Sequence, residues 1–118
     1  MGGASETAVE IGRLKSLDQD WDSYGAERID DSAVADAMRF LLHVDVLWGA
    51  AKFVRPLVGP TPDGGVALIW GERGHGEVET RFSPRGNRYV VVRDRKVVAQ
   101  GPVDDSFVKV LIDQYLRR

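Results

Sequence analysis

The sequence predicts an α+β fold in which two N-terminal helices and one C-terminal helix pack on an antiparallel meander sheet of four or five strands. Three observations predict it. The chain has 118 residues, the size of one ordinary domain, so we expect a single domain over residues 1–118. Apolar residues recur every three or four positions before residue 49 and after residue 104, as in amphipathic helices. Between about residues 54 and 100, short apolar runs are separated by turn residues, which is typical of strands.

The first helix is expected at about residues 5–20. Thr7 and Glu10 have the spacing of a capping box, in which each side chain bonds a free backbone N–H at the start of a helix. An apolar stripe follows, formed by Ala8, Ile11, Leu14, Leu17 and Trp21. Such a stripe needs a flat apolar surface to pack on.

The second helix is expected at about residues 31–49. Asp30, Asp31 and Ser32 supply side chains that can cap its N-terminus. Its apolar face runs from Val34 to Trp48, and a glycine follows at residue 49 as its expected end.

The strands are expected from about residue 54 to residue 100. Pro56 and Pro60 confine the first strand to an edge of the sheet. Residues 66–70 are apolar at every position, which indicates a strand covered on both faces, or covered on one face and used for binding on the other. Residues 77–82 alternate between polar and apolar, and a tight connection at residues 94–95 joins the last two strands. Gly101 and Pro102 are expected to end the sheet.

The last helix is expected at about residues 104–117. Asp104 or Asp105 can cap its start, and Phe107, Val108 and Leu111 belong to its apolar face. Two arginines at residues 117 and 118 complement the helix dipole at its C-terminal end.

The charge is unevenly distributed along the chain, although the total is only −2. Residues 1–50 hold ten acids and four bases, a net charge of −6, whereas residues 73–96 hold seven bases and three acids, a net charge of +4. These segments either form two surfaces of opposite charge or neutralise each other within the fold. A basic stretch this short gives only weak support to nucleic-acid binding.

Several classes of protein are not expected. The chain has no cysteine, which excludes disulfides, thiolate nucleophiles and zinc held by cysteine. It has no apolar run of the roughly 18 residues that a membrane span needs, and its first residues do not resemble a signal peptide. We therefore expect a cytoplasmic protein that does not enter the membrane.

No metal site, cofactor or catalytic nucleophile is expected either. Asp18, Asp20 and Asp22 begin like a calcium loop, but Ser23 and Ile29 stand where that loop needs glycine and glutamate. The two histidines, at residues 43 and 75, lack zinc-site spacing, and no serine lies in a nucleophile-elbow sequence. We expect a protein that is not an enzyme.

The most informative feature is aromatic. Trp21 and Tyr24 lie three residues apart across a turn that ends at Gly25. Two interpretations remain open: the aromatic residues fix the helices to the sheet while Asp22 accepts backbone N–H bonds, or they form an exposed anchor for a partner. Trp, Tyr and Arg dominate interface hot spots, and Arg81, Arg85 and Arg88 would supply the arginine component.

Two segments resemble a known group of proteins. They are residues 21–26, with the sequence WDSYGA, and residues 60–70, with the sequence PTPDGGVALIW. In both, the chain is similar to a group of small, mostly uncharacterised bacterial and phage-borne proteins. Members of that group often carry an acid before the second Trp, where this chain has Ile69, so no role of that acid carries over. The resemblance implies no activity; it implies a protein of mobile or defence-related gene sets, and with that an antitoxin-like or inhibitor-like role.

The leading expectation is a non-enzymatic protein-binding module that masks a partner protein, with a second copy of the chain as a further candidate partner. The expected binding residues are Trp21, Asp22, Tyr24, Ile69, Arg81, Arg85 and Arg88. The expected structural residues of the two motifs are Gly25, Asp63, Gly64, Gly65 and Trp70. One alternative is a nucleic-acid-associated protein that uses the basic residues 73–96. The other is a small ligand-binding protein or hydrolase that uses the acids Asp22, Asp63, Glu77 and Glu79.

Overall fold

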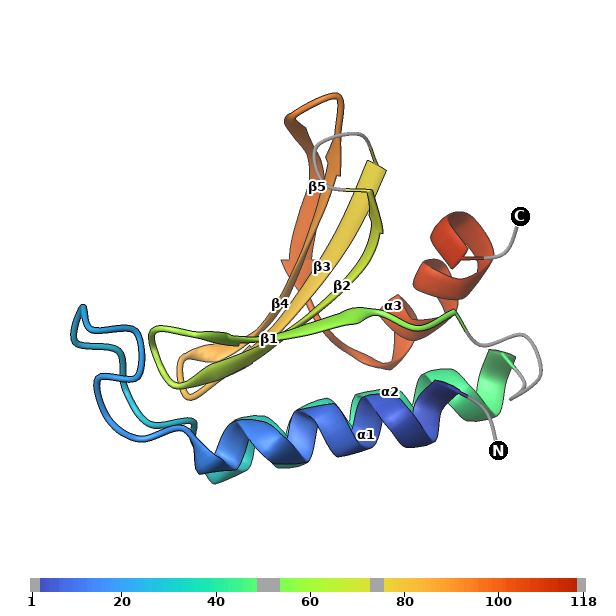
Figure 1. Ribbon diagram of the computed structural model, residues 1–118. Helices are drawn as coiled ribbons and strands as arrows, with labels where there is room; N and C mark the ends of the chain where they lie inside the picture. The colour runs from blue at the N-terminus through green and yellow to red at the C-terminus, as the bar shows by residue number, and fades with distance from the viewer. Residues whose placement is uncertain (1–2, 49–53, 73–75, 117–118) are drawn as a thin grey trace.

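The computed structural model of the chain describes residues 3–48, 54–72 and 76–116. It confirms the α+β fold: helices pack on an antiparallel sheet of five strands (Figure 1). The elements in chain order are α1 (Gly3–Arg13), η1 (Leu14–Ser16), α2 (Asp31–Trp48), β1 (Leu57–Thr61), β2 (Gly65–Glu72), β3 (Gly76–Ser83), β4 (Gly86–Arg93), β5 (Lys96–Pro102), α3 (Asp105–Val110) and η3 (Leu111–Leu116). None of the described helices is long and apolar enough to span a membrane.

The sheet is a meander in the order β1-β2-β3-β4-β5, with every neighbouring pair antiparallel. Tight turns join β1 to β2, β3 to β4 and β4 to β5, and Asp94 and Arg95, between β4 and β5, both have positive φ. A β-bulge between Val91 and Val92 shifts the register of the last pair. β4 and β5 continue to pair beyond this bulge. β5 therefore includes Gly101 and Pro102 and ends two residues after the predicted end of the sheet at about residue 100.

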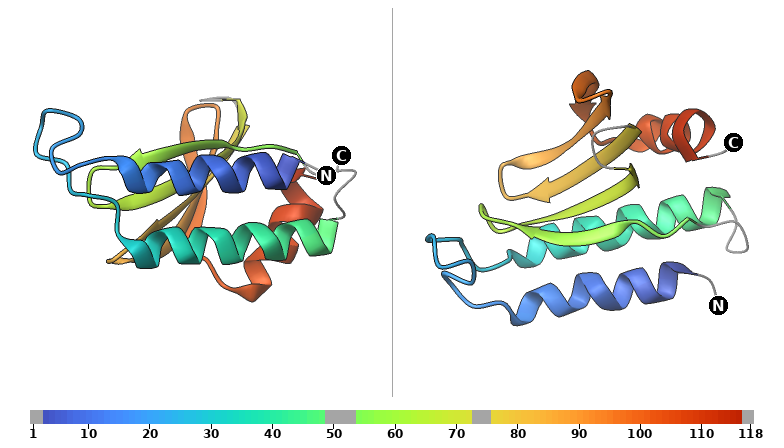
Figure 2. Two further views of the ribbon diagram at one scale, coloured as in Figure 1. Left: turned by 60° about the horizontal axis from the view of Figure 1, so that its bottom comes forward. Right: turned by 45° about the horizontal axis from the view of Figure 1, so that its top comes forward.

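The described helices all lie on one face of the sheet (Figures 1 and 2). α1 and α2 form an antiparallel hairpin beneath the β1–β2 end, and α3 lies beside α2. Phe40 of α2 is at the centre of the core, with its ring centroid 5.3 Å from that of Phe82, 6.2 Å from that of Trp70 and 6.3 Å from that of Phe107. The core therefore joins α2, α3 and the inner side of the sheet.

The first helix differs from the sequence prediction at both ends. α1 begins at Gly3, so Thr7 lies inside the helix, where it is fully buried, and the predicted capping box with Glu10 is wrong. The helix ends at Arg13 and one 3₁₀ turn follows, after which Leu17 has an extended backbone. Trp21 therefore lies in a loop, not on the helix.

The other two helices begin at the positions that their capping residues predict. The Asp30 carboxylate accepts the backbone N–H of Ser32 at the start of α2, 3.0 Å away. Asp104 accepts the N–H of Phe107 at 3.0 Å at the start of α3. α3 passes into a π-helical turn, η3, at Leu111. The predicted end of the second helix at residue 49 and the arginines at 117 and 118 lie outside the described residues.

Candidate protein-interaction surface

The face of the sheet turned away from the helices is the surface on which most of the expected binding residues lie. We call it the outer sheet face. Side chains alternate between faces along a strand, and cross-strand partners share a face, so the register assigns its members in three rows. The rows are Gly59, Ala67, Arg81, Arg88 and Pro102; Leu57, Ile69, Glu79, Val90 and Gln100; and Gly71, Glu77, Val92 and Val97.

The middle and third rows are rich in apolar side chains. Leu57 is 70% exposed and Val97 is 57% exposed, whereas Ile69, Val90 and Val92 are half-buried. On β2 the inner residues, including Trp70, are buried against the helices, while Ile69 faces outward. Of the two arrangements that the apolar run at residues 66–70 allowed, this strand is thus covered by helices on one face only.

One end of the outer sheet face carries arginines. Arg81 of β3 and Arg88 of β4 are direct cross-strand partners in the first row. Arg85 lies in the turn between these strands and is exposed, as is Arg88. The Arg81 guanidinium donates to the carboxylate of Glu79 on its own strand. This end therefore holds three cations and one directly bonded carboxylate.

The loop between η1 and α2 is held by its own side chains. The Asp22 carboxylate accepts the N–H groups of Tyr24 and Ala26, at 2.8 and 3.1 Å. The Trp21 indole N–H donates to the carbonyl of Glu27 at 3.0 Å. Trp21 and Asp22 are half-buried, while Tyr24 is 91% exposed. Trp21 is thus bonded within its own loop, Asp22 accepts backbone N–H groups as the first interpretation expects, and Tyr24 is presented to solvent.

The same loop is fixed to the β1–β2 turn, so the two segments of the resemblance are in contact. The N–H of Glu27 donates to the carbonyl of Pro62 at 2.9 Å, and the N–H of Asp30 donates to the carbonyl of Gly64 at 2.8 Å. A Cβ on Gly64 would lie 2.9 Å from the carbonyl oxygen of Arg28, and its φ is +87°. Only glycine allows this approach without displacing the backbone.

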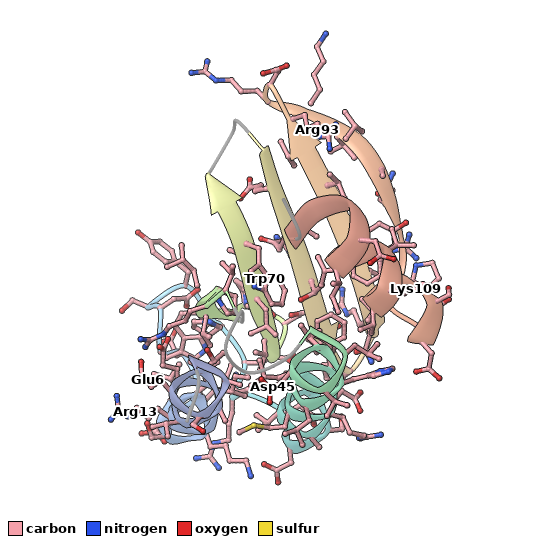
Figure 3. The ribbon with its side chains drawn as sticks, turned by 90° about the vertical axis from the view of Figure 1, so that its right-hand side faces the viewer. Glu6, Arg13, Asp45, Trp70, Arg93 and Lys109 are labelled. Atoms are coloured by element: carbon pink, nitrogen blue, oxygen red, sulfur yellow. The ribbon has the colours of Figure 1, made fainter. Side chains whose placement is uncertain are left out.

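The remaining motif residues, Asp63, Gly65 and Trp70, also make contacts within the fold. Asp63 accepts the hydroxyl of Thr61 at 2.5 Å within the β1–β2 turn. A Cβ on Gly65 would lie 2.6 Å from the carbonyl oxygen of Phe82, so β2 and β3 approach closely there. The indole N–H of Trp70 donates to the carbonyl of Val54 at 2.8 Å, and Figure 3 shows this ring between the sheet and the helices.

The structure brings part of the expected binding set together. The loop with Tyr24, the β1–β2 turn and the β3–β4 turn with Arg85 lie at the same end of the molecule (Figures 1 and 2). Arg81, Arg88 and Ile69 lie on the outer sheet face near that end. Sequence reasoning did not include three apolar residues of that face, Leu57, Val90 and Val97. The short turn at residues 84–85 was the signal that could have found Val90, because it fixes which residues of β3 and β4 pair.

The four acids of the ligand-binding alternative do not converge. Asp22 and Asp63 each hold hydrogen bonds within their own turns, and Glu79 bonds Arg81 on the open sheet. Within residues 3–48, 54–72 and 76–116, no three His, Asp or Glu side chains are arranged to hold a metal ion. His75, and Arg73 at the start of the predicted basic stretch, lie outside these residues.

A pocket of about 360 Å³ lies between α2 and the start of α3. Its polar side chains are largely occupied: Asp36 accepts from Arg39 at 2.8 Å and from the side-chain amide of Asn87 at 3.1 Å, and Asp104 caps α3. The Oδ1 of Asn87 is buried and has no hydrogen-bond partner among the described groups, but the amide of the same side chain is already held by Asp36. The pocket is therefore a weaker candidate than the outer sheet face.

The clearest pKa perturbations belong to structural groups. The Ser106 hydroxyl, followed by the N–H of Phe107, lowers the pKa of Asp104 below its ordinary value of 3.8. The Ser32 hydroxyl and N–H lower the pKa of Asp30 in the same way. On α1, Glu10 and Glu6 bond the Arg55 guanidinium, and Glu10 is the larger cause of the raised pKa of Arg55. These shifts mark helix caps and an ion pair that joins α1 to the segment before β1.

Comparison of the chain with protein-family models, with curated proteins and with solved structures finds no match. The function is therefore inferred from the geometry and chemistry of the outer sheet face.

Proposed function

We propose that the protein is a non-enzymatic binding module that masks a partner protein with its outer sheet face, in the manner of an antitoxin or an inhibitor. The observation that carries the proposal is the row formed by Leu57, Ile69, Glu79, Val90 and Gln100, which crosses all five strands on the face that the helices leave open. Apolar side chains that are half-buried in the free protein become fully buried under a partner, which stabilises a complex.

Two further features support the proposal. Tyr24 is 91% exposed on a loop whose backbone is fixed by hydrogen bonds, so a partner that binds this side chain has little backbone to order. Arginine and tyrosine are enriched in hot spots, and this end of the molecule presents both. Of the four acids of the enzyme alternative, by contrast, Asp22, Asp63 and Glu79 are bonded locally.

The test uses two matched double variants in a capture experiment. Ile69→Thr with Val90→Thr removes apolar surface from the outer sheet face but keeps residues that favour strands. Val9→Thr with Val46→Thr makes a comparable change on the helices, where these valines are 54% and 78% exposed. Each protein is tagged and used to capture partners from lysate of the native host, with and without nuclease treatment, after circular dichroism has shown that it is folded.

We expect a stoichiometric protein partner with the wild type and the helix variant, and its loss with the sheet variant. A loss of about 1 kcal/mol at each position lowers the affinity about thirtyfold. Equal capture by all three proteins, or loss only with the helix variant, would refute the use of this face. Recovery of nucleic acid alone from untreated lysate would favour the nucleic-acid alternative.

A further inference from the structure

The charges of the protein are unevenly divided between the first two helices and the last three strands. Residues 3–48, which form α1, α2 and their connecting loop, carry ten acids and four bases, a net charge of −6. Residues 76–102, which form β3, β4 and β5, carry six bases and three acids, a net charge of +3. Several bases of the helical layer pair with acids of the same layer, as Lys15 does with Asp31 and Arg28 with Asp18. The acidic layer and the basic strands thus present charges of opposite sign.

The basic charge is arranged unfavourably for the free protein at one place. Arg81 and Arg88 face each other directly across β3 and β4 on the outer sheet face. Like charges at directly opposite positions destabilise a sheet, and Glu79 bonds only one of the two arginines. Arg85 adds a third positive charge at the adjoining turn. A carboxylate placed between these arginines would relieve the repulsion and could accept paired N–H bonds from a guanidinium.

The row next to the arginines favours the carboxylates of a protein segment over the phosphates of a nucleic acid. Next to the arginines lie Ile69 and Val90, with Glu79 between them, and Glu77 lies in the row beyond. A nucleic-acid backbone that reached the arginines and crossed this face would bring phosphates against two carboxylates and against apolar side chains. A protein segment that has carboxylates only beside the arginines, and apolar side chains over Ile69 and Val90, avoids that repulsion.

We propose that the partner segment received by the outer sheet face is an acidic protein segment, whose carboxylates bind Arg81, Arg85 and Arg88 and whose apolar side chains pack on Ile69 and Val90. This inference rests on the proposed function and names the chemistry of its partner. On this view the arginines determine the specificity and the association rate of the complex, while the row with Ile69 and Val90 contributes most of the apolar area that the partner buries.

The test uses charge-reversal variants that alter net charge equally. Arg85→Glu with Arg88→Glu reverses two charges at the arginine end. Arg13→Glu with Lys109→Glu reverses two charges on α1 and α3, where Figure 3 shows both residues. The probe is an eight-residue peptide of four glutamates followed by four leucines, which matches β4 in length and can place carboxylates and apolar side chains on successive rows of the face. Its binding to isotope-labelled protein is followed by NMR, with a leucine–lysine peptide and a single-stranded DNA of about eight nucleotides, the length of one small single-strand site, as competitors.

We expect the glutamate peptide to shift amide signals of β3 and β4 and to bind at least about tenfold more weakly to the arginine variant, while the helix variant binds as the wild type does. The inference is overturned if the lysine peptide binds equally well, if both variants weaken binding equally, or if DNA displaces the peptide. It is also overturned by salt-sensitive self-association that is lost in the arginine variant, because the acidic helices of a second copy would then be the occupant.

The two proposals fail separately. A captured partner that is lost with Ile69→Thr and Val90→Thr but retained by the arginine variant leaves the binding module intact and refutes the acidic segment. If no captured protein depends on Ile69 and Val90, the proposed function itself fails, whatever the peptide does.

Discussion

Replacing Gly64 and Gly25 separately by alanine isolates the junction between the tyrosine-bearing loop and the β1–β2 turn. Both glycines have nearly the same backbone conformation, with φ of +87° and +85°. Alanine in this left-handed region costs roughly 1–2 kcal/mol at either position. They differ in their surroundings: an added Cβ meets nothing within 4 Å at Gly25, but lies 2.9 Å from the Arg28 carbonyl oxygen at Gly64.

The Gly64 variant must therefore push the loop away from the turn. This displaces the hydrogen bonds from Glu27 to Pro62 and from Asp30 to Gly64, each worth about 1 kcal/mol. We expect Gly64→Ala to lower the free energy of unfolding by about 3 kcal/mol and Gly25→Ala by about 1 kcal/mol. In urea unfolding the two midpoints should differ by about 1 M. Equal midpoints would show that the loop is not fixed to the turn as described, and would remove the rigid support that we assign to Tyr24.

Other variants test further contacts of the fold. Trp21→Phe keeps an aromatic ring but removes the N–H that bonds Glu27, so urea unfolding should show a loss of about 1 kcal/mol; an unchanged midpoint would contradict that bond. Asp104→Asn tests the cap of α3: because folding lowers the pKa of Asp104, its carboxylate contributes stability above pH 3.8, and thermal melts should show the advantage over asparagine disappearing as the pH falls through the folded pKa. Arg55→Gln should lower the melting temperature in low salt, with a smaller difference in high salt, since the ion pairs of Arg55 with α1 are partly exposed; a salt-independent difference would point to packing instead.

The fold class follows from the sequence because the period of the apolar residues changes once, near residue 54, and again near residue 102. The end of α1 does not follow from that period. Leu14, Leu17 and Trp21 continue the helical spacing, yet the chain leaves the helix because side-chain oxygens bond the backbone of the following loop. Asp20 accepts the N–H of Gly25 at 2.6 Å, and Asp22 accepts two more N–H groups. Aspartate side chains compete in this way with the hydrogen bonds of a helix, and the spacing of the apolar residues does not reveal this competition.

The candidate surface could be predicted only in part, because it depends on strand register. Arg81, Arg85 and Arg88 were recognisable as arginines near one hairpin, but that Arg81 and Arg88 are direct partners follows from the two-residue turn at residues 84–85. The bulge between Val91 and Val92 adds a residue to β5, and the register beyond it determines that Val97 shares the outer face with Val92. No residue type in that segment demands a bulge at this position. A one-residue difference in register would have moved these side chains to the other face.

The direct pairing of Arg81 and Arg88 lowers the stability of the free protein but favours the binding of an acidic segment. Arg88→Glu would place a carboxylate directly opposite Arg81, and an opposite-charge pair at such a position contributes roughly 0.2–1 kcal/mol, where two arginines now repel. The variant should therefore unfold at a slightly higher urea concentration than the wild type, but it should no longer bind the acidic segment. Arg88→Gln should lie between the two proteins both in urea midpoint and in affinity for the acidic segment. A sheet selected only for its own stability would favour the glutamate. If the variant is instead less stable than the wild type, the like-charge pair costs the free protein nothing, and the physical reason for expecting an anionic partner at this end of the sheet is lost.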